Sequence, residues 1–163
     1  MSIQSTMHAI QSIDFMISIR ESALVYPIIL ATHLSIIAAF GGLILLTDLR
    51  LMGVALKDYT VTQVVTGLRP WKHAGLTIML AAGLLLGGSE ADKYYPNPYF
   101  WTKMTLLIAA VVHAIVFRGS VYRNTEALDR APTLPTAAKV AGFTSILIWA
   151  GIACMGRLIA YYE

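Results

Sequence analysis

Residues 26–47 read YPIILATHLSIIAAFGGLILLT, and this stretch decides the fold class. It contains no charged side chain, and His33 is its only imidazole. A helix of 22 residues rises about 33 Å, which is enough to cross the roughly 30 Å of hydrocarbon in a bilayer. The stretch therefore predicts a transmembrane helix.

Three further apolar stretches follow, at residues 70–88, 99–117 and 138–160. The chain as a whole is 57% hydrophobic and 13% charged, whereas soluble domains are nearer 45–50% apolar and about 25% charged. Small residues within the stretches, among them Gly83 and Gly142, allow helices to pack closely. We therefore expect an all-α integral membrane protein, a four-helix up-down bundle forming a single transmembrane domain over residues 1–163.

The segment before the first span, residues 3–24, is amphipathic. Ile10, Ile13, Met16 and Ile17 recur at helical spacing, and polar residues lie between them. Such a pattern predicts an N-terminal helix lying in the membrane interface.

Four spans place both termini on one side of the membrane, which we name side A, and the loops 48–69 and 118–138 on side B. Side B then holds eight basic residues: Arg50, Lys57, Arg69, Lys72, Arg118, Arg123, Arg130 and Lys139. Side A holds four: Arg20, Lys93, Lys103 and Arg157. By the positive-inside rule, side B is cytoplasmic and both termini are periplasmic in a bacterial inner (cytoplasmic) membrane.

Several functional classes are disfavoured. The basic residues are scattered and not interleaved with aromatic residues, so we expect no nucleic-acid partner. The single cysteine, Cys154, can form neither an internal disulfide nor a cysteine-based metal site, and there is no CxxCH motif for covalent haem. Nucleotide-binding loops and the HExxH and GxSxG motifs are also missing from the sequence.

Two histidines lie at similar depth near side B. His73 is about three residues inside the second span, and His113 about four residues inside the third. Imidazoles facing each other across a helix bundle are the usual axial ligands of haem b, so this pair predicts a haem site with His73 and His113 as the metal ligands. The alternative is that His73 is an interfacial histidine and His113 hydrogen-bonds to a neighbouring helix.

A second group of polar residues lies nearer side A. His33 is about seven residues inside the first span, with Lys103, Met155 and Arg157 as candidate neighbours. These residues predict a cofactor-binding site for a second haem or a quinone headgroup. The alternative is that Lys103 and Arg157 extend to lipid headgroups and His33 makes an internal hydrogen bond.

The sequence also resembles a known family. The resemblance rests on Tyr26-Pro27, on His33 followed by a glycine pair, on Asn97-Pro98 with Lys103, on the closing run from Gly156 to Tyr161, and on the segment TDLRLMG at residues 47–53. These features look like a bacterial four-helix membrane family of unknown function. More distantly, they are similar to the copper-resistance D proteins and to the membrane-bound, haem-carrying protoporphyrinogen oxidase. The latter resemblance implies roles for His33 and Lys103.

These observations predict a membrane b-type cytochrome-like subunit that passes electrons between a quinol and a redox partner. Iron held by two imidazoles has no open coordination position, which favours electron transfer over substrate chemistry. We expect haem b and quinone as cofactors, the lipid bilayer as surroundings, and assembly as an oligomer or with redox partner subunits. The alternatives are a protoporphyrinogen oxidase-like enzyme and a non-catalytic structural subunit of a larger membrane complex.

Overall fold

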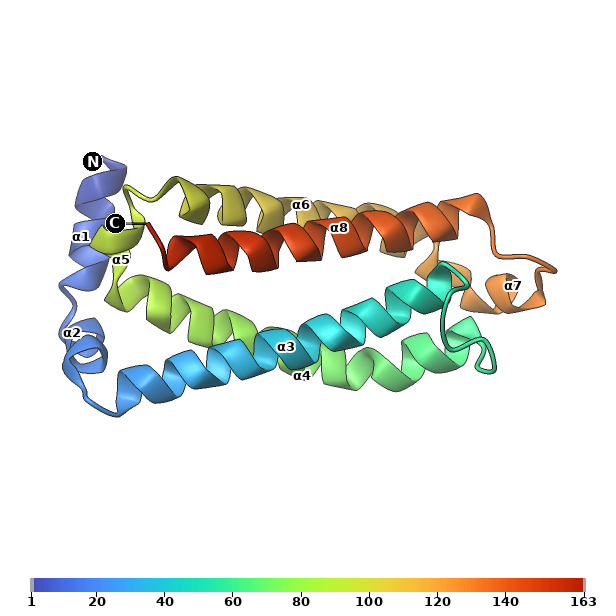
Figure 1. Cartoon of the computed structure of the whole chain (residues 1–163), viewed down its shortest axis with the longest axis horizontal. Helices are drawn as coiled ribbons and strands as arrows, with labels where there is room; N and C mark the ends of the chain where they lie inside the picture. Colours follow the sequence, from blue (N-terminus) through green and yellow to red (C-terminus); the bar gives the residue numbers. More distant parts are fainter. Residues whose placement is uncertain (1, 163) are drawn as a thin grey trace.

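The computed structural model describes residues 2–162, with the backbone alone for residues 118–120. Every regular element in this part of the chain is helical, in agreement with the expected all-α class. Figure 1 shows the four longest helices running side by side along the long axis, with the two termini at one end. They are α3 (Val25–Leu51), α4 (Val61–Ser89), α6 (Pro98–Ser120) and α8 (Thr136–Ile159).

Short helices cover the two ends of these four. At the end with the termini, side A, lie α1 (Ile3–Gln11), α2 (Asp14–Glu21) and α5 (Ala91–Tyr94). At the opposite end, side B, lie the 3₁₀ turn η1 (Tyr122–Asn124) and α7 (Thr125–Arg130). The N-terminal segment is thus two short helices and not one, because Ile13 adopts an extended conformation between them.

The second predicted span, residues 70–88, starts later than the helix that contains it, α4. Pro70 suggests a helix beginning there, whereas α4 begins at Val61 and contains Pro70 in its interior. Thr60 and Gln63 form a reciprocal capping box at its first turn. From α7, the carboxylate of Asp129 accepts the backbone N–H groups of Val61 and Thr62, at 2.6 and 3.2 Å. These acceptors satisfy backbone donors that would otherwise remain unpaired at the helix start.

The four helices pack in the order α4, α3, α8, α6, so α3 contacts α4 on one side and α8 on the other. By contrast, α4 and α6 make at most marginal contact. A cluster of buried apolar side chains joins α3, α4 and α8 near side B, and includes Leu51, Val61 and Ala141.

Most apolar side chains on the outer faces of the long helices are exposed, as illustrated by Leu84 (74%) and Ile115 (70%). Three of the described segments are long and apolar enough to cross a membrane: Val25–Leu51, Pro98–Arg130 and Thr136–Ile159. The first half of α4, which is not among them, carries Arg69, Lys72 and His73. An apolar outer surface with polar groups inside is the arrangement that a bilayer favours.

Glycines allow three of the helix contacts. A Cβ atom at Gly142 on α8 would lie 2.7 Å from the Asp48 carbonyl oxygen on α3. One at Gly83 would lie 3.1 Å from the His33 ring, and one at Gly151 would lie 3.1 Å from Leu106 on α6. Small residues at such positions let the backbones approach closely.

Replacing Gly142 with alanine tests the closest of these contacts. The added methyl group meets a backbone oxygen, which cannot move without shifting α3, so we expect a loss of about 1–3 kcal/mol of stability. The measurement is the thermal unfolding midpoint of the purified protein in detergent. Gly41→Ala is the control: nothing lies within 4 Å of its added methyl, so its midpoint should be unchanged or higher. Equal midpoints for Gly142→Ala and the wild type would contradict the close packing of α3 on α8.

Candidate functional site

His33 lies half-buried on α3, at its contact with α4. Its ring packs against Gly83 and lies within reach of the backbone carbonyl of Met79, both on α4. The other ring nitrogen, Nδ1, is buried and has no hydrogen-bond partner within the described part of the chain. Lys103 on α6 lies close enough for its charge to act on the imidazole.

Lys103 connects this region to the remaining helix. Its side chain is partly buried, and its Nζ lies 3.6 Å from the position that a Cβ of Gly156 on α8 would occupy. All four long helices therefore contribute to one region near side A, through His33, Gly83, Lys103 and Gly156. The structure thus places Lys103 within charge interaction of His33.

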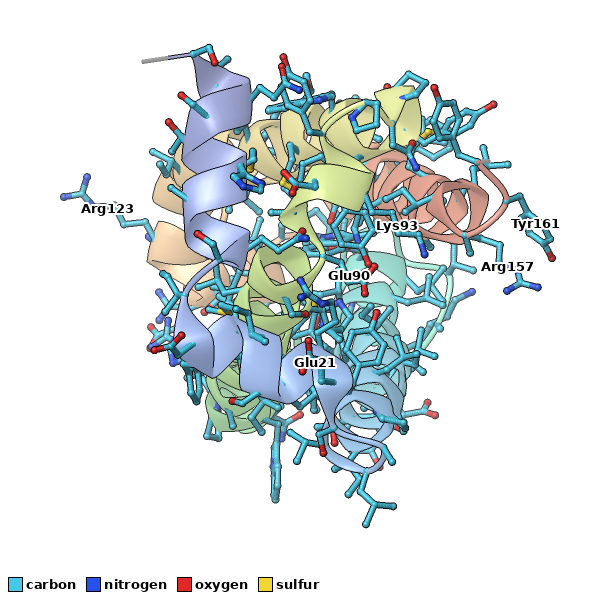
Figure 2. The ribbon with its side chains drawn as sticks, turned by 90° about the vertical axis from the view of Figure 1, so that its left-hand side faces the viewer. Glu21, Glu90, Lys93, Arg123, Arg157 and Tyr161 are labelled. Atoms are coloured by element: carbon cyan, nitrogen blue, oxygen red, sulfur yellow. The ribbon has the colours of Figure 1, made fainter. Side chains whose placement is uncertain are left out.

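The other two predicted members of the side A group differ from each other. Met155 is partly buried on α8. Arg157 is exposed, and its guanidinium hydrogen-bonds to the Tyr161 hydroxyl and lies 4.7 Å from the centre of the Tyr161 ring. Figure 2 shows both Arg157 and Tyr161 projecting outward from the bundle. Arg157 therefore has the extended, surface-directed placement of the alternative interpretation.

His113 lies half-buried on α6, near side B. Its ring lies 4.7 Å from the ring of Phe117, centre to centre, and within reach of the backbone carbonyl of Ala141 on α8. Its Nε2 is buried and, like Nδ1 of His33, has no hydrogen-bond partner within residues 2–162 as described. His33 and His113 thus each have one buried ring nitrogen without a protein partner in the described part of the chain.

His73 is placed differently from the other two. It is exposed, and it lies across α4 from the buried row of Lys72, Gly75 and Met79. Since α4 and α6 barely touch, the structure gives no contact between His73 and His113 in the part of the chain that it describes. Their pairing about one iron stays a prediction.

A buried polar cluster that the sequence analysis did not identify lies at the α3–α4 contact. The amine of Lys72 donates a hydrogen bond to the Thr47 hydroxyl at 3.2 Å, and that hydroxyl donates to the Leu43 carbonyl at 2.9 Å. Lys72 is 4% exposed, and so is Asp48, the residue after Thr47. The spacing in the sequence does indicate that Lys72 is buried. Lys72 comes three residues before Gly75 and seven before Met79, so all three lie on the same face of α4.

This cluster and His113 lie at one level of the bundle. Asp48 contacts α8 at Gly142, and His113 reaches α8 at the preceding residue, Ala141. The bundle therefore has two polar levels, one around His33 and Lys103 near side A and one around Lys72 and His113 near side B. Ionisable groups inside a membrane are costly, and they commonly mark functional sites.

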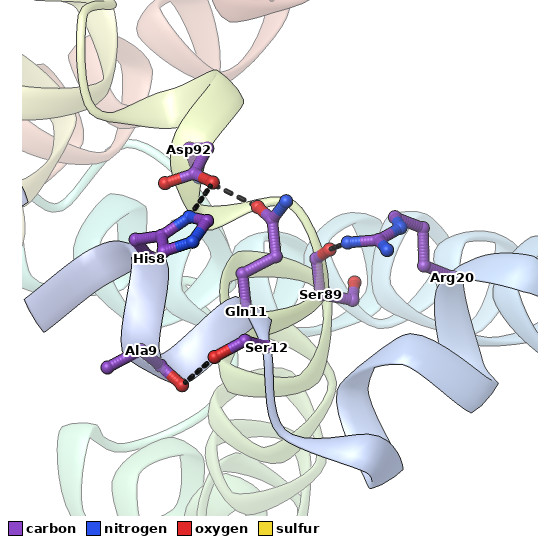
Figure 3. Close-up of polar contacts among 7 residues, drawn as sticks. All are labelled: His8, Ala9, Gln11, Ser12, Arg20, Ser89 and Asp92. Atoms are coloured by element: carbon purple, nitrogen blue, oxygen red, sulfur yellow. Dashed lines mark hydrogen bonds and ion pairs between the residues drawn. The ribbon is translucent and has the colours of Figure 1, made fainter. Parts of the chain in front are cut away.

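His8 has a structural contact. Its Nδ1 lies 2.9 Å from the Asp92 carboxylate on α5, and Gln11 accepts the backbone N–H of Asp92 at 2.8 Å (Figure 3). Arg20 donates to the Ser89 carbonyl at the end of α4, at 3.4 Å. These contacts attach α1 and α2 to the side A end of the bundle, so His8 serves as a surface control for the other histidines.

Comparison with known proteins assigns the chain to a family. The model of a family described only as a family of unknown function (DUF6644) matches residues 15–162, which is nearly the whole chain. The chain belongs to this family. The match includes all four long helices and leaves out α1, which carries His8 and Gln11. No curated protein and no solved structure matches the chain.

The different exposure of the histidines can be tested by chemical modification. Because His73 is exposed while His33 and His113 are half-buried, we expect diethyl pyrocarbonate to modify His73 well before the other two. Mass spectrometry of the peptides from protein treated in detergent measures the three rates. Modification of His113 as fast as His73 would contradict the placement of its ring between α6 and α8.

Proposed function

We propose that the protein is a membrane b-type cytochrome-like subunit that passes electrons between a quinol and a redox partner. The observation that supports it is the pair of buried imidazole nitrogens, Nδ1 of His33 and Nε2 of His113, which lack partners in the described chain. An unsatisfied buried polar atom costs about 1–3 kcal/mol, and most such atoms in native proteins are bonded. A ligand from outside the chain would supply the missing bonds.

On side B, the residue that fits a haem iron is His113. The Ala141 carbonyl and the Phe117 ring fix the orientation of its imidazole, which leaves Nε2 free to coordinate. His73, at a similar depth on α4, is the proposed second ligand. When bound, haem b would supply a centre that gains and loses one electron.

On side A, His33 and Lys103 suit a quinol headgroup. A quinol carries two hydroxyl groups, and Nδ1 of His33 can accept a hydrogen bond from one of them. The ammonium group of Lys103 can donate to an oxygen of the same headgroup. Because Gly83 and Gly156 have no side chain, the backbone of α4 lies close to His33 and the backbone of α8 lies close to Lys103.

The proximity of His33 and Lys103 also supports a second candidate function. In a protoporphyrinogen oxidase-like enzyme, these two residues would hold the reacting cofactor, and the side B histidines would be structural. The observation that favours this candidate is that side chains from α3 and α6, far apart in the sequence, lie within charge interaction of each other.

The spectrum of the purified protein tests the cofactor. We expect the reduced-minus-oxidised difference spectrum of six-coordinate haem b. His113→Ala and His73→Ala should each lose most of the haem, because each removes one of two iron bonds. His33→Ala should keep the side B haem, because His33 lies at the other polar level.

His8→Ala is the matched control, since it replaces an exposed histidine whose side chain pairs with Asp92 at the surface. A colourless protein without iron would refute the cytochrome proposal. Retention of haem by His73→Ala and His113→Ala together with its loss in His33→Ala would favour the oxidase-like candidate. Unchanged assembly and turnover of a parent complex in all three variants would favour a structural subunit.

We also propose that α4 is the fourth span and that side B faces the cytoplasm. The packing of α4 along the membrane-length helix α3 supports the first point, and the excess of basic residues on side B supports the second. In this orientation, both termini and the His33 region lie toward the periplasm of a bacterial inner membrane.

Cysteine labelling in intact cells tests the orientation. With Cys154 replaced by serine, Arg123→Cys should resist a membrane-impermeant maleimide, because residue 123 lies at side B. Lys93→Cys, at the other end of the bundle, should react and is the matched control. Labelling of Arg123→Cys with protection of Lys93→Cys would reverse the proposed topology.

A further inference from the structure

A third group of polar side chains lies between His33 and the side A surface. Tyr26 on α3 and Tyr94 on α5 lie close enough for their hydroxyl groups to interact. Glu90, at the end of α4, lies close enough for its charge to act on both hydroxyls. Its side chain is 22% exposed and lies 3.9 Å from the amine of Lys93 (oxygen to nitrogen), at the end of the bundle that faces the viewer in Figure 2.

This group lies in line with His33 along two helices. Tyr26 precedes His33 by seven residues on α3. Glu90 is the C-cap residue of α4, seven residues after Gly83, which contacts the His33 ring. Seven residues are almost two full turns, so Tyr26 and His33 lie on one face of α3, about 10 Å apart along its axis. Two or three bridging waters, each linking polar groups about 3 Å apart, would span that separation.

The proposed reaction needs a path for protons. Oxidation of one quinol to a quinone releases two electrons and two protons. In the proposed function the electrons pass one at a time to haem b and then to the redox partner. The protons must reach water, and Nδ1 of His33, which is buried, can accept a proton but cannot deliver it directly to the surface.

We propose that Tyr26, Tyr94 and Glu90 form the route by which protons move between His33 and the side A surface. The proposal rests on the proposed function for the direction and source of the protons. A proton leaves the quinol hydroxyl for Nδ1 of His33 and passes through water to the tyrosine pair. It then reaches the Glu90 carboxylate, which releases it to solvent.

The chemistry of the individual groups fits these roles. Burial raises the pKa of the Tyr94 hydroxyl, with the neighbouring Tyr26 and the charge of Glu90 acting in the same direction. Tyr94 therefore stays neutral and relays protons by giving one away as it receives another. Glu90, partly exposed beside Lys93, is the member of the route that exchanges with bulk water.

The route is tested first without quinol, by nitrogen-15 NMR of the purified full chain carrying labelled histidine. Exchange of the His33 ring proton with water should slow by about tenfold or more in Glu90→Gln and in Tyr94→Phe, because each variant removes a group that passes protons on. Glu21→Gln is the control, because Glu21 is an exposed acid at the same end that pairs with Arg20. Exchange in both route variants at the wild-type rate would overturn the proposal.

Stopped-flow reduction of the haem by duroquinol then connects the route to turnover. Both variants should react about tenfold more slowly with a larger solvent isotope effect, and added formate should restore the rate of Glu90→Gln by carrying protons in its place. A wild-type protein that duroquinol does not reduce would refute the proposed function, while slowed ring exchange in the variants would still support the route. Slow variants with no rescue and an unchanged isotope effect would assign a structural role to Glu90 and overturn the route.

Discussion

The contacts of α3 with two neighbours at once are the constraint on which the rest of the structure depends. Gly142 lets α8 approach the Asp48 carbonyl, and Gly83 lets α4 approach His33. A methyl group added at Gly142 would collide with the α3 backbone, and one added at Gly83 would crowd the His33 ring. Because α3 carries polar side chains at both of these contacts, the same packing that holds the helices together also fixes the two polar levels of the bundle.

The bilayer gives these polar levels their chemical significance. In water, Lys72 or His33 would gain little from burial, but in hydrocarbon the only favourable position for such groups is between helices. Lys72 meets this requirement with the hydroxyl of Thr47. His33 and His113 each keep a buried ring nitrogen without a partner in the described part of the chain, which distinguishes them from a purely structural polar group.

The sequence predicted the helical class and the approximate helix positions, because long apolar runs determine both. It did not predict the start of α4, because the Asp129 carboxylate that binds there comes from a segment 68 residues later. Depth along a helix can be counted from the sequence for His73 and His113, but the direction in which each side chain points cannot. Direction depends on which helices are neighbours, and the order α4, α3, α8, α6 separates the two helices that carry these histidines.

The two polar levels are far apart along the bundle axis. His33 and Thr47 lie on the same helix, 14 residues from each other, which corresponds to about 21 Å. A quinol at the first level and a haem at the second would therefore lie toward opposite faces of the membrane. An electron moving between them would cross most of the bilayer, while the proton from the same quinol would leave on side A. Under the proposed function, the spacing of the polar groups on α3 makes the reaction one that separates charge across the membrane.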